Sequence, residues 1–172
     1  LLLDLTDKIY SSGWEEGLLS LAFDPDYANN SFVYVFYSMD NPKRSQLSRF
    51  TVSSDNMVDR SSELVLLEIL KPSNGHNGGM LQFGTDGLLY VSVGDGYRGY
   101  LAQDLKDLKG SLLRLDVSNA SETVPYKIPS DNPYANNSKG IQPEIFAWGF
   151  RNPLRFSIDE LRKSYDAIFI GC

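Results

Sequence analysis

The sequence predicts an all-β fold, and three observations lead to this prediction. Short runs rich in Val, Ile, Phe and Tyr alternate with turns rich in Gly, Pro, Asn and Asp along the whole chain. A Phe-x-x-Asp motif recurs at Phe23, Phe83 and Phe156, each time between two apolar runs. Only residues 100–109 have the composition of a longer helix, which we expect to end at Gly110. A repeated strand–turn–strand unit is typical of the four-stranded blades of a β-propeller, although generic hairpins produce a similar pattern.

Ten strands are expected, each an apolar or alternating run that stops at turn residues. They are residues 18–23, 32–37, 47–52, 64–70, 80–83, 88–93, 112–117, 145–148, 154–158 and 167–170. The residues that stop them are, in order, Asp24-Pro25, Asp40-Asn41-Pro42, Ser53-Ser54-Asp55, Pro72, Gly84, Gly94, Ser118-Asn119, Gly149, Asp159 and Gly171. No linker or low-complexity tract interrupts this order, so we interpret residues 1–172 as belonging to one domain.

The composition is that of a folded, acidic protein. Hydrophobic residues make up 42% of the chain and aromatic residues 12%, which is enough to build a core. The net charge of −6 and a pI near 4.7 argue against nucleic acid or an anionic membrane surface as a partner. No apolar run reaches the roughly 20 residues that span a bilayer. The one cysteine, Cys172, excludes an internal disulfide framework.

Three Asn-x-Ser sequons begin at Asn29, Asn119 and Asn136, in polar, turn-like stretches that suit glycan acceptors. About one or two are expected by chance, so they favour a secreted or extracellular glycoprotein only weakly. The chain begins at Leu1, without an initiator Met or a signal peptide. We therefore expect it to be part of a longer or processed protein.

His76, the only histidine, lies among glycines just before an expected strand. Glycines let the backbone bend sharply and approach a bound molecule, and a neutral imidazole can accept a proton near physiological pH. A lone histidine is more often a surface or structural residue. Here, however, Asp95 in a Gly-Asp-Gly loop and the Arg151-Asn152-Pro153 segment also follow apolar runs, and this company makes His76 a candidate general base.

A second motif, Gly94-x-Gly96-x-x-Gly99, matches the dinucleotide-binding pattern, with Asp116 near the place of a ribose-binding acid. Only ten residues separate Gly99 from Gly110, which is short for a helix that crosses between parallel strands. No other part of the chain has a strand–helix–strand pattern. We therefore interpret these glycines as a tight loop at a strand end and expect no NAD binding.

Six phrases, taken together and in this order, resemble the glucose/sorbosone dehydrogenase family, and most of all its eukaryotic branch of hedgehog-interacting-protein-like members. The phrases are Glu15-Glu16-Gly17-Leu18-Leu19-Ser20-Leu21-Ala22-Phe23-Asp24-Pro25-Asp26-Tyr27, His76-Asn77-Gly78-Gly79, Leu89-Tyr90-Val91-Ser92-Val93-Gly94-Asp95-Gly96, Leu112-Leu113-Arg114-Leu115-Asp116-Val117, Ile128-Pro129-Ser130-Asp131-Asn132-Pro133 and Ala147-Trp148-Gly149-Phe150-Arg151-Asn152-Pro153. The resemblance implies a six-bladed β-propeller, of which residues 1–172 would supply about the first three blades, truncated at the C-terminus. It also explains the Phe-x-x-Asp repeat.

The resemblance implies a sugar dehydrogenase that uses pyrroloquinoline quinone (PQQ) and calcium. His76 takes the place of the catalytic base, and Arg151 that of a cleft arginine that assists catalysis and binds the cofactor. Glu15, Asp95 and Asn152 fall at further cofactor-binding positions, whereas the calcium ligands are expected beyond Cys172. The isolated 172-residue piece is therefore expected to be inactive and to lack a sharp unfolding transition.

Two departures keep a second function open. The enzymes usually carry arginine where this chain has Met80, and glutamine where it has Glu15, so a carboxylate would stand beside an anionic cofactor. The alternative is a secreted, non-catalytic propeller that binds an extracellular protein instead of a small sugar. Asp95 and Arg151 could then serve only to hold their loops, and Glu15 could lie in a solvated turn. Trp14 and Trp148 are interpreted as packing residues between blades.

Overall fold

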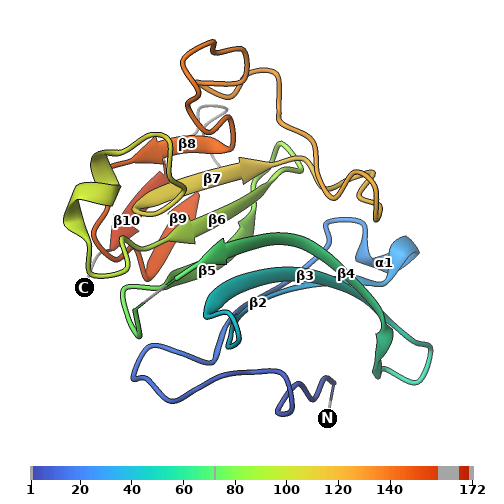
Figure 1. Ribbon diagram of the computed structural model, residues 1–172. Coiled ribbons are helices and arrows are strands. Elements are labelled where there is room, and N and C mark those ends of the chain that lie inside the picture. Colours follow the sequence, from blue (N-terminus) through green and yellow to red (C-terminus); the bar gives the residue numbers. More distant parts are fainter. Residues whose placement is uncertain (1, 72, 159–166, 171–172) are drawn as a thin grey trace.

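The computed structural model describes residues 2–71, 73–158 and 167–170, and this part of the chain is almost entirely β-structure (Figure 1). All ten expected strands are present. They are β1 (Leu18–Phe23), β2 (Phe32–Met39), β3 (Arg44–Val52), β4 (Val58–Leu70), β5 (Gly78–Phe83), β6 (Leu89–Val93), β7 (Ser111–Leu115), β8 (Ile145–Trp148), β9 (Arg155–Ile158) and β10 (Ala167–Ile170). The helices are the four-residue α1 (Tyr27–Asn30) and the 3₁₀ helix η1 (Gly99–Gln103).

The strands form two four-stranded antiparallel sheets and one two-stranded sheet. The first sheet has the order β1-β2-β3-β4, the second has the order β5-β6-β7-β8, and β9 pairs with β10. The recurring phenylalanines occupy the first hairpin of each sheet: Phe23 pairs with Val33, Phe83 with Leu89, and Phe156 with Phe169. The sequence repeat is therefore a structural repeat, and each full unit is a four-stranded meander like a propeller blade.

The first strands of the three sheets lie next to one another. β5 contacts β1 on one side and β9 on the other. The largest core cluster is buried where the first sheet faces the second, with Phe36 and Leu47 contributed by one and Leu89 and Leu113 by the other. Burying each such side chain stabilises the fold by about 1.5–3 kcal/mol, so this interface fixes the relative position of the loops at the sheet ends.

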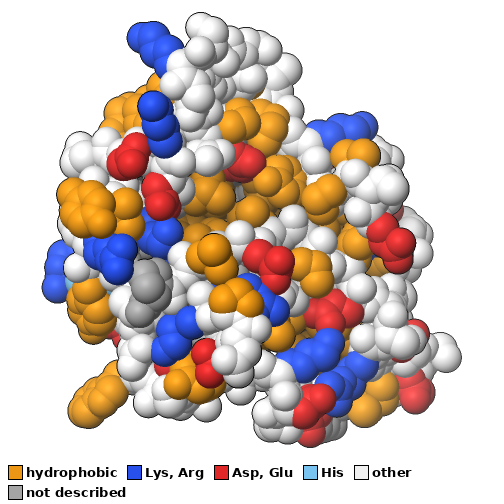
Figure 2. All heavy atoms as spheres, viewed as in Figure 1, with side chains coloured by type: hydrophobic (Ala, Val, Ile, Leu, Met, Phe, Trp, Pro, Cys, Tyr) orange, Lys and Arg blue, Asp and Glu red, His pale blue; other side chains and the backbone are white. Residues whose placement is uncertain are grey.

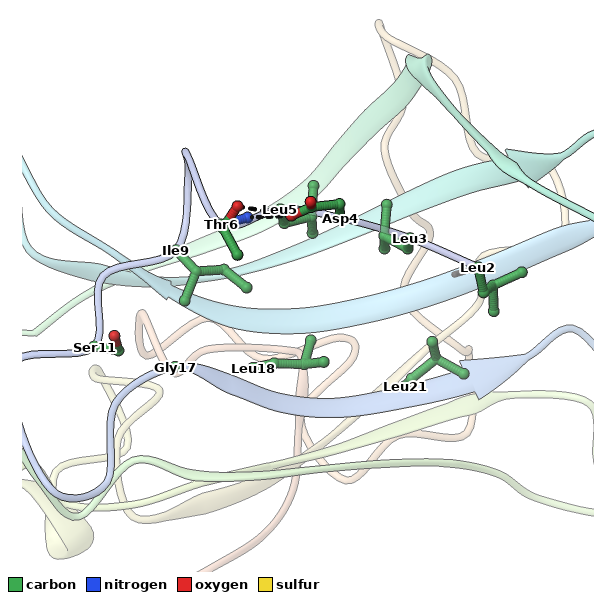
Figure 3. Close-up of a pocket in the computed structure, with 10 residues that line it drawn as sticks. All are labelled: Leu2, Leu3, Asp4, Leu5, Thr6, Ile9, Ser11, Gly17, Leu18 and Leu21. Atoms are coloured by element: carbon green, nitrogen blue, oxygen red, sulfur yellow. Dashed lines mark hydrogen bonds between the residues drawn. The ribbon is translucent and has the colours of Figure 1, made fainter.

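The opposite face of the first sheet is covered by the N-terminal segment, residues 2–9. Leu5 is buried in a second cluster with Val33 and Phe50, and Lys8 forms an ion pair with Glu63 of β4. A pocket of about 570 Å³ remains between this segment and β1. Figure 3 shows its apolar side chains facing one another: Leu2, Leu3 and Ile9 from the segment, and Leu18 and Leu21 from β1.

The expected helix over residues 100–109 is wrong beyond its first turn. The structure has the 3₁₀ helix η1 and then turns, because two aspartate side chains take over backbone donors that a helix would use. Asp104 Oδ1 accepts from the backbone N–H of Lys106 at 3.0 Å, and Asp107 Oδ1 accepts from that of Lys109 at 2.8 Å. Local side-chain bonds of this kind compete with helical hydrogen bonds.

Charges of both signs are interspersed on the face of the molecule that Figure 2 displays. This face carries no broad basic surface of the kind that nucleic acid requires. Among the residues that the structure describes, no helix has the length and apolar character needed to cross a membrane.

Candidate active site

The predicted site residues come from four loops at the same end of the sheets, on the left in Figure 1. These loops precede β1, β5 and β9 and follow β6. Because β5 starts where its antiparallel neighbour β6 ends, with Gly78 opposite Val93, the loops that carry His76 and Asp95 are neighbours. The loop before β9, which carries Arg151 and Asn152, reaches the same place through the contact between β5 and β9.

A pocket of about 330 Å³ opens among these loops. Its lining residues are His76, Asp95, Tyr97, Gly99, Ala102, Gln103, Gly149 and Arg151. The pocket therefore unites three of the five predicted site residues.

His76 and Asp95 form a buried pair in this pocket. The Nδ1 atom of His76 lies 2.6 Å from Oδ1 of Asp95, and both residues are less than 5% exposed. The carboxylate accepts the Nδ1–H bond, which leaves Nε2 of a neutral imidazole with a free lone pair. Asp95 Oδ1 also accepts from the backbone N–H of Tyr97 at 2.9 Å, so this aspartate caps its own loop and orients the histidine as well.

Arg151 contributes to the site through two different groups. Its backbone oxygen accepts a hydrogen bond from the N–H of Asp95 at 2.8 Å, which ties the two loops together. Its side chain is exposed and lines the pocket. Within the described part of the chain the guanidinium makes no hydrogen bond or ion pair, so its donors are available to a ligand.

Glu15 and Asn152 lie behind His76, outside the pocket lining. Glu15 Oε2 accepts from the backbone N–H of His76 at 2.6 Å and from Nδ2 of Asn152 at 3.2 Å. Asn152 is buried, and its Oδ1 accepts from the backbone N–H of Gly78 at 2.9 Å. Glu15 is thus not a solvated turn residue: both side chains support the turn that carries His76.

That turn adopts a conformation that side chains other than glycine rarely take. His76 has φ 52°, in the left-handed region, which costs about 1–2 kcal/mol for a residue with a Cβ. Gly94 permits the close packing that holds it, since a Cβ at position 94 would lie 2.0 Å from the backbone oxygen of His76. His76 and Tyr97 of this pocket are among five residues other than glycine with positive φ in the described part of the chain, and strained backbone of this kind is common at functional sites.

Lys71, which the sequence did not single out, lies directly beneath the same turn. It is 1% exposed, and its Nζ donates to the backbone oxygen of His76 and to Oδ1 of Asn77, both at 3.1 Å. Burial, assisted by the charge of Lys109, lowers the pKa of Lys71 to about 7, while Glu15 and Asp95 oppose this shift. The turn therefore rests on a buried lysine whose positive charge is disfavoured by its burial.

Two further expectations concern the surroundings of the pocket. β6 and β7 pair antiparallel, so Gly94, Gly96 and Gly99 connect neighbouring antiparallel strands and not a strand–helix–strand crossover. Trp14 is fully exposed in this part of the fold, whereas the ring of Trp148 lies 5.6 Å from that of Tyr134, so packing between blades stays a prediction for Trp14. In residues 2–71, 73–158 and 167–170, no group of three or more His, Cys, Asp or Glu side chains could hold a metal ion.

Two proteins are similar in sequence to most of this chain. Human hedgehog-interacting protein is 39% identical over 161 residues, which are 86% of this chain and 23% of that protein. Aldose sugar dehydrogenase YliI of Escherichia coli is 33% identical over 141 residues, 80% of this chain and 36% of that enzyme. The chain therefore spans only a quarter to a third of the length of these relatives.

A solved structure has the same fold. The PQQ-bound aldose sugar dehydrogenase of Streptomyces coelicolor superposes with a TM-score of 0.68 at 27% identity, over 84% of this chain and 39% of that one. A sequence profile of the glucose/sorbosone dehydrogenase family matches residues 3–164. The profile covers nearly the whole chain, and the resemblance found in the sequence is confirmed: the chain belongs to the glucose/sorbosone dehydrogenase family.

Proposed function

We propose that this chain is part of a PQQ-dependent aldose dehydrogenase in which His76 removes a proton from a sugar hydroxyl. One observation carries the proposal: the imidazole of His76 is paired with Asp95 at 2.6 Å in a pocket that Arg151 also lines. A base oriented by a carboxylate beside a free cation is what proton removal coupled to hydride transfer needs. The similarity to aldose sugar dehydrogenases supports this reading.

The chain's own residues would act as follows. Asp95 holds the Nδ1–H of His76 and favours the positive charge that the imidazole gains when Nε2 accepts the hydroxyl proton. Glu15, Asn152 and Lys71 hold the turn that places this imidazole. When bound, PQQ supplies the hydride acceptor.

The pocket suits PQQ in one testable respect. PQQ carries carboxylates and quinone oxygens, which are hydrogen-bond acceptors, and the exposed guanidinium of Arg151 offers planar donors with a positive charge. We propose Arg151 as the cofactor contact in this half of the site, with Asp95 beside it in the pocket lining and with Glu15 and Asn152 supporting the site from behind His76. Calcium ligands are proposed to lie in a part of the family fold that follows residue 172.

We further propose that the complete domain is a six-bladed propeller. The two successive four-stranded meanders would be its first two blades, and the β9–β10 pair the start of a third. The contact of β5 with both β1 and β9 supports this arrangement, because the first strand of each blade lines the centre of a propeller.

The test is cofactor binding and turnover by the full-length protein. PQQ with calcium, titrated into the purified protein and followed by calorimetry, is expected to bind, and the loaded protein is expected to reduce a dye when aldoses are added. A protein that neither binds PQQ nor oxidises any aldose contradicts the proposal.

A second function has specific support. Glu15 and Met80 stand where the enzymes usually carry glutamine and arginine, and hedgehog-interacting protein is among the similar proteins. We therefore keep a secreted module that binds an extracellular protein as the alternative. It is favoured if surface plasmon resonance detects a hedgehog-type ligand on a full-length protein that has failed the PQQ test.

Secretion is proposed in either case, and the placement of the sequons supports it. Asn29, Asn119 and Asn136 are all exposed, and they follow β1, follow β7 and precede β8, at the sheet ends opposite the pocket. Glycans there would leave the pocket open. From a secreting eukaryotic host, the protein is expected to lose mass on endoglycosidase treatment, unlike a variant with all three asparagines changed to glutamine. A wild-type mass equal to that of the bare polypeptide would contradict glycosylation at these sites.

A further inference from the structure

The ring of Tyr97 lies against the candidate base. The centroids of Tyr97 and His76 are 4.0 Å apart, with the rings tilted by 45°. His76 is 4% exposed although it lines a pocket, whereas Tyr97 is 59% exposed. The phenol ring thus has one side toward the imidazole and the other toward solvent.

The neighbouring backbone is built to keep the ring in this place. Tyr97 has φ 61°, in the left-handed region, and its N–H is held by Asp95 Oδ1 at 2.9 Å. Gly75 makes room for the phenol, since a Cβ at position 75 would lie 2.5 Å from the Tyr97 hydroxyl oxygen. A bulky residue persists in such a conformation only when its surroundings determine it, so the ring position is a defined feature of the site.

We propose that Tyr97 is a specificity-determining residue, whose ring forms the wall that a substrate must pass to reach His76. The part of this inference that concerns a sugar substrate rests on the proposed function. The shielding of His76 by the Tyr97 ring does not depend on it. A fixed aromatic wall leaves an approach for a single sugar ring, which can lay its C–H face against the phenol. It obstructs a substrate that carries a second sugar ring next to the reacting hydroxyl.

Acylation of His76 by diethyl pyrocarbonate tests the shielding without cofactor or substrate. The reagent transfers an ethoxycarbonyl group to an imidazole nitrogen, and mass spectrometry of the peptide that contains His76 gives the rate in the full-length protein. Tyr97→Ala is expected to raise this rate about tenfold, whereas Tyr97→Phe, which keeps the ring, is expected to leave it unchanged. Tyr100→Ala is the matched control: Tyr100 is a tyrosine of similar exposure three residues further on, in η1, and it does not line the pocket.

A second substitution at position 97 repeats the acylation test. Tyr97→Asn repeats it with a residue that adopts positive φ more readily, in case the alanine variant does not fold. If neither small residue speeds acylation, or if Tyr100→Ala speeds it equally, the proposal is overturned.

Steady-state kinetics test the specificity. In Tyr97→Ala, the ratio of kcat/KM for a reducing disaccharide whose second ring is on O2, next to the reacting C1 hydroxyl, to kcat/KM for the corresponding monosaccharide is expected to rise about tenfold. An unchanged ratio in an active enzyme overturns the specificity proposal, even if acylation is faster. If the full-length protein has no aldose activity but His76 is acylated faster in Tyr97→Ala, the proposed function is contradicted. The shielding of His76 by Tyr97 is then still supported.

Discussion

Replacing His76 by glutamine is expected to lower kcat for aldose oxidation by the full-length protein about 10²–10⁴-fold, the usual contribution of a positioned general base. Glutamine keeps a polar side chain of similar reach, so the hydrogen bond with Asp95 can be partly replaced, but it cannot accept the hydroxyl proton. Steady-state dye reduction with saturating sugar measures the loss. Calorimetric binding of PQQ serves as the control for folding and is expected to change little.

Arg151→Lys supplies the companion variant. Lysine keeps the positive charge but not the planar, two-pronged donor geometry, so weaker cofactor binding and a smaller loss of activity are expected. If His76→Gln retains the wild-type kcat, His76 is not the base, although the fold and the family stand. If Arg151→Lys binds PQQ as the wild type does, the guanidinium is not the cofactor contact.

Replacing Gly94 by alanine is expected to disrupt the turn that carries His76. The new Cβ would lie 2.0 Å from the His76 backbone oxygen and 3.1 Å from Oδ1 of Asn152. A clash with backbone cannot be relieved by a side-chain rotation, and overpacking of this kind typically costs about 1–3 kcal/mol or more. The displaced oxygen also accepts from Nζ of Lys71, so the polar support of the turn is lost together with its packing.

Thermal unfolding of the full-length protein measures this effect, and a decrease in Tm of about 2 °C or more is expected. Gly99→Ala is the matched control in the same glycine-rich loop. The nearest atom to a Cβ at position 99 is 3.9 Å away, so a change within about 0.5 kcal/mol is expected. Equal Tm values for the two variants would contradict the close approach of Gly94 to His76.

The strands could be predicted because their signal is local. Alternating apolar residues and turn residues specify where the backbone extends and where it reverses, and the ends of β1, β8 and β10 agree to the residue. β4 begins six residues earlier than expected, at Val58, where its backbone N–H donates to the oxygen of Leu2. Pairing with β3, in which Val58 lies opposite Val52, together with this bond to the N-terminal segment extends the strand into a stretch whose own composition is polar.

The helix expected over residues 100–109 failed for a different reason. Its composition suited a helix, but Asp104 and Asp107 each bonded a backbone N–H two residues ahead. Side-chain competition of this kind depends on a rotamer choice that composition does not determine.

The sequence singled out five residues of the candidate site, but it did not predict the contacts among them. The glycines around His76 and Asp95 pointed to sharp loops at strand ends, and the structure joins these two residues at 2.6 Å. Glu15 and Asn152 were also singled out. Their contact spans 137 residues, and only the packing of β5 against β1 and β9 turned them into supports behind the histidine.

The sequence by itself determined the all-β fold and the repeated strand–turn–strand unit, because both follow from residue type, spacing and local pattern. Its resemblance to known sequences also identified the family. The tertiary structure alone decided what surrounds His76. Lys71 lies buried under the turn and Tyr97 lies across the imidazole, and neither had a signal in the sequence. A lysine is usually exposed and an aromatic ring can point to either side of its loop, so only the closure of neighbouring sheets selects the burial of one and the direction of the other.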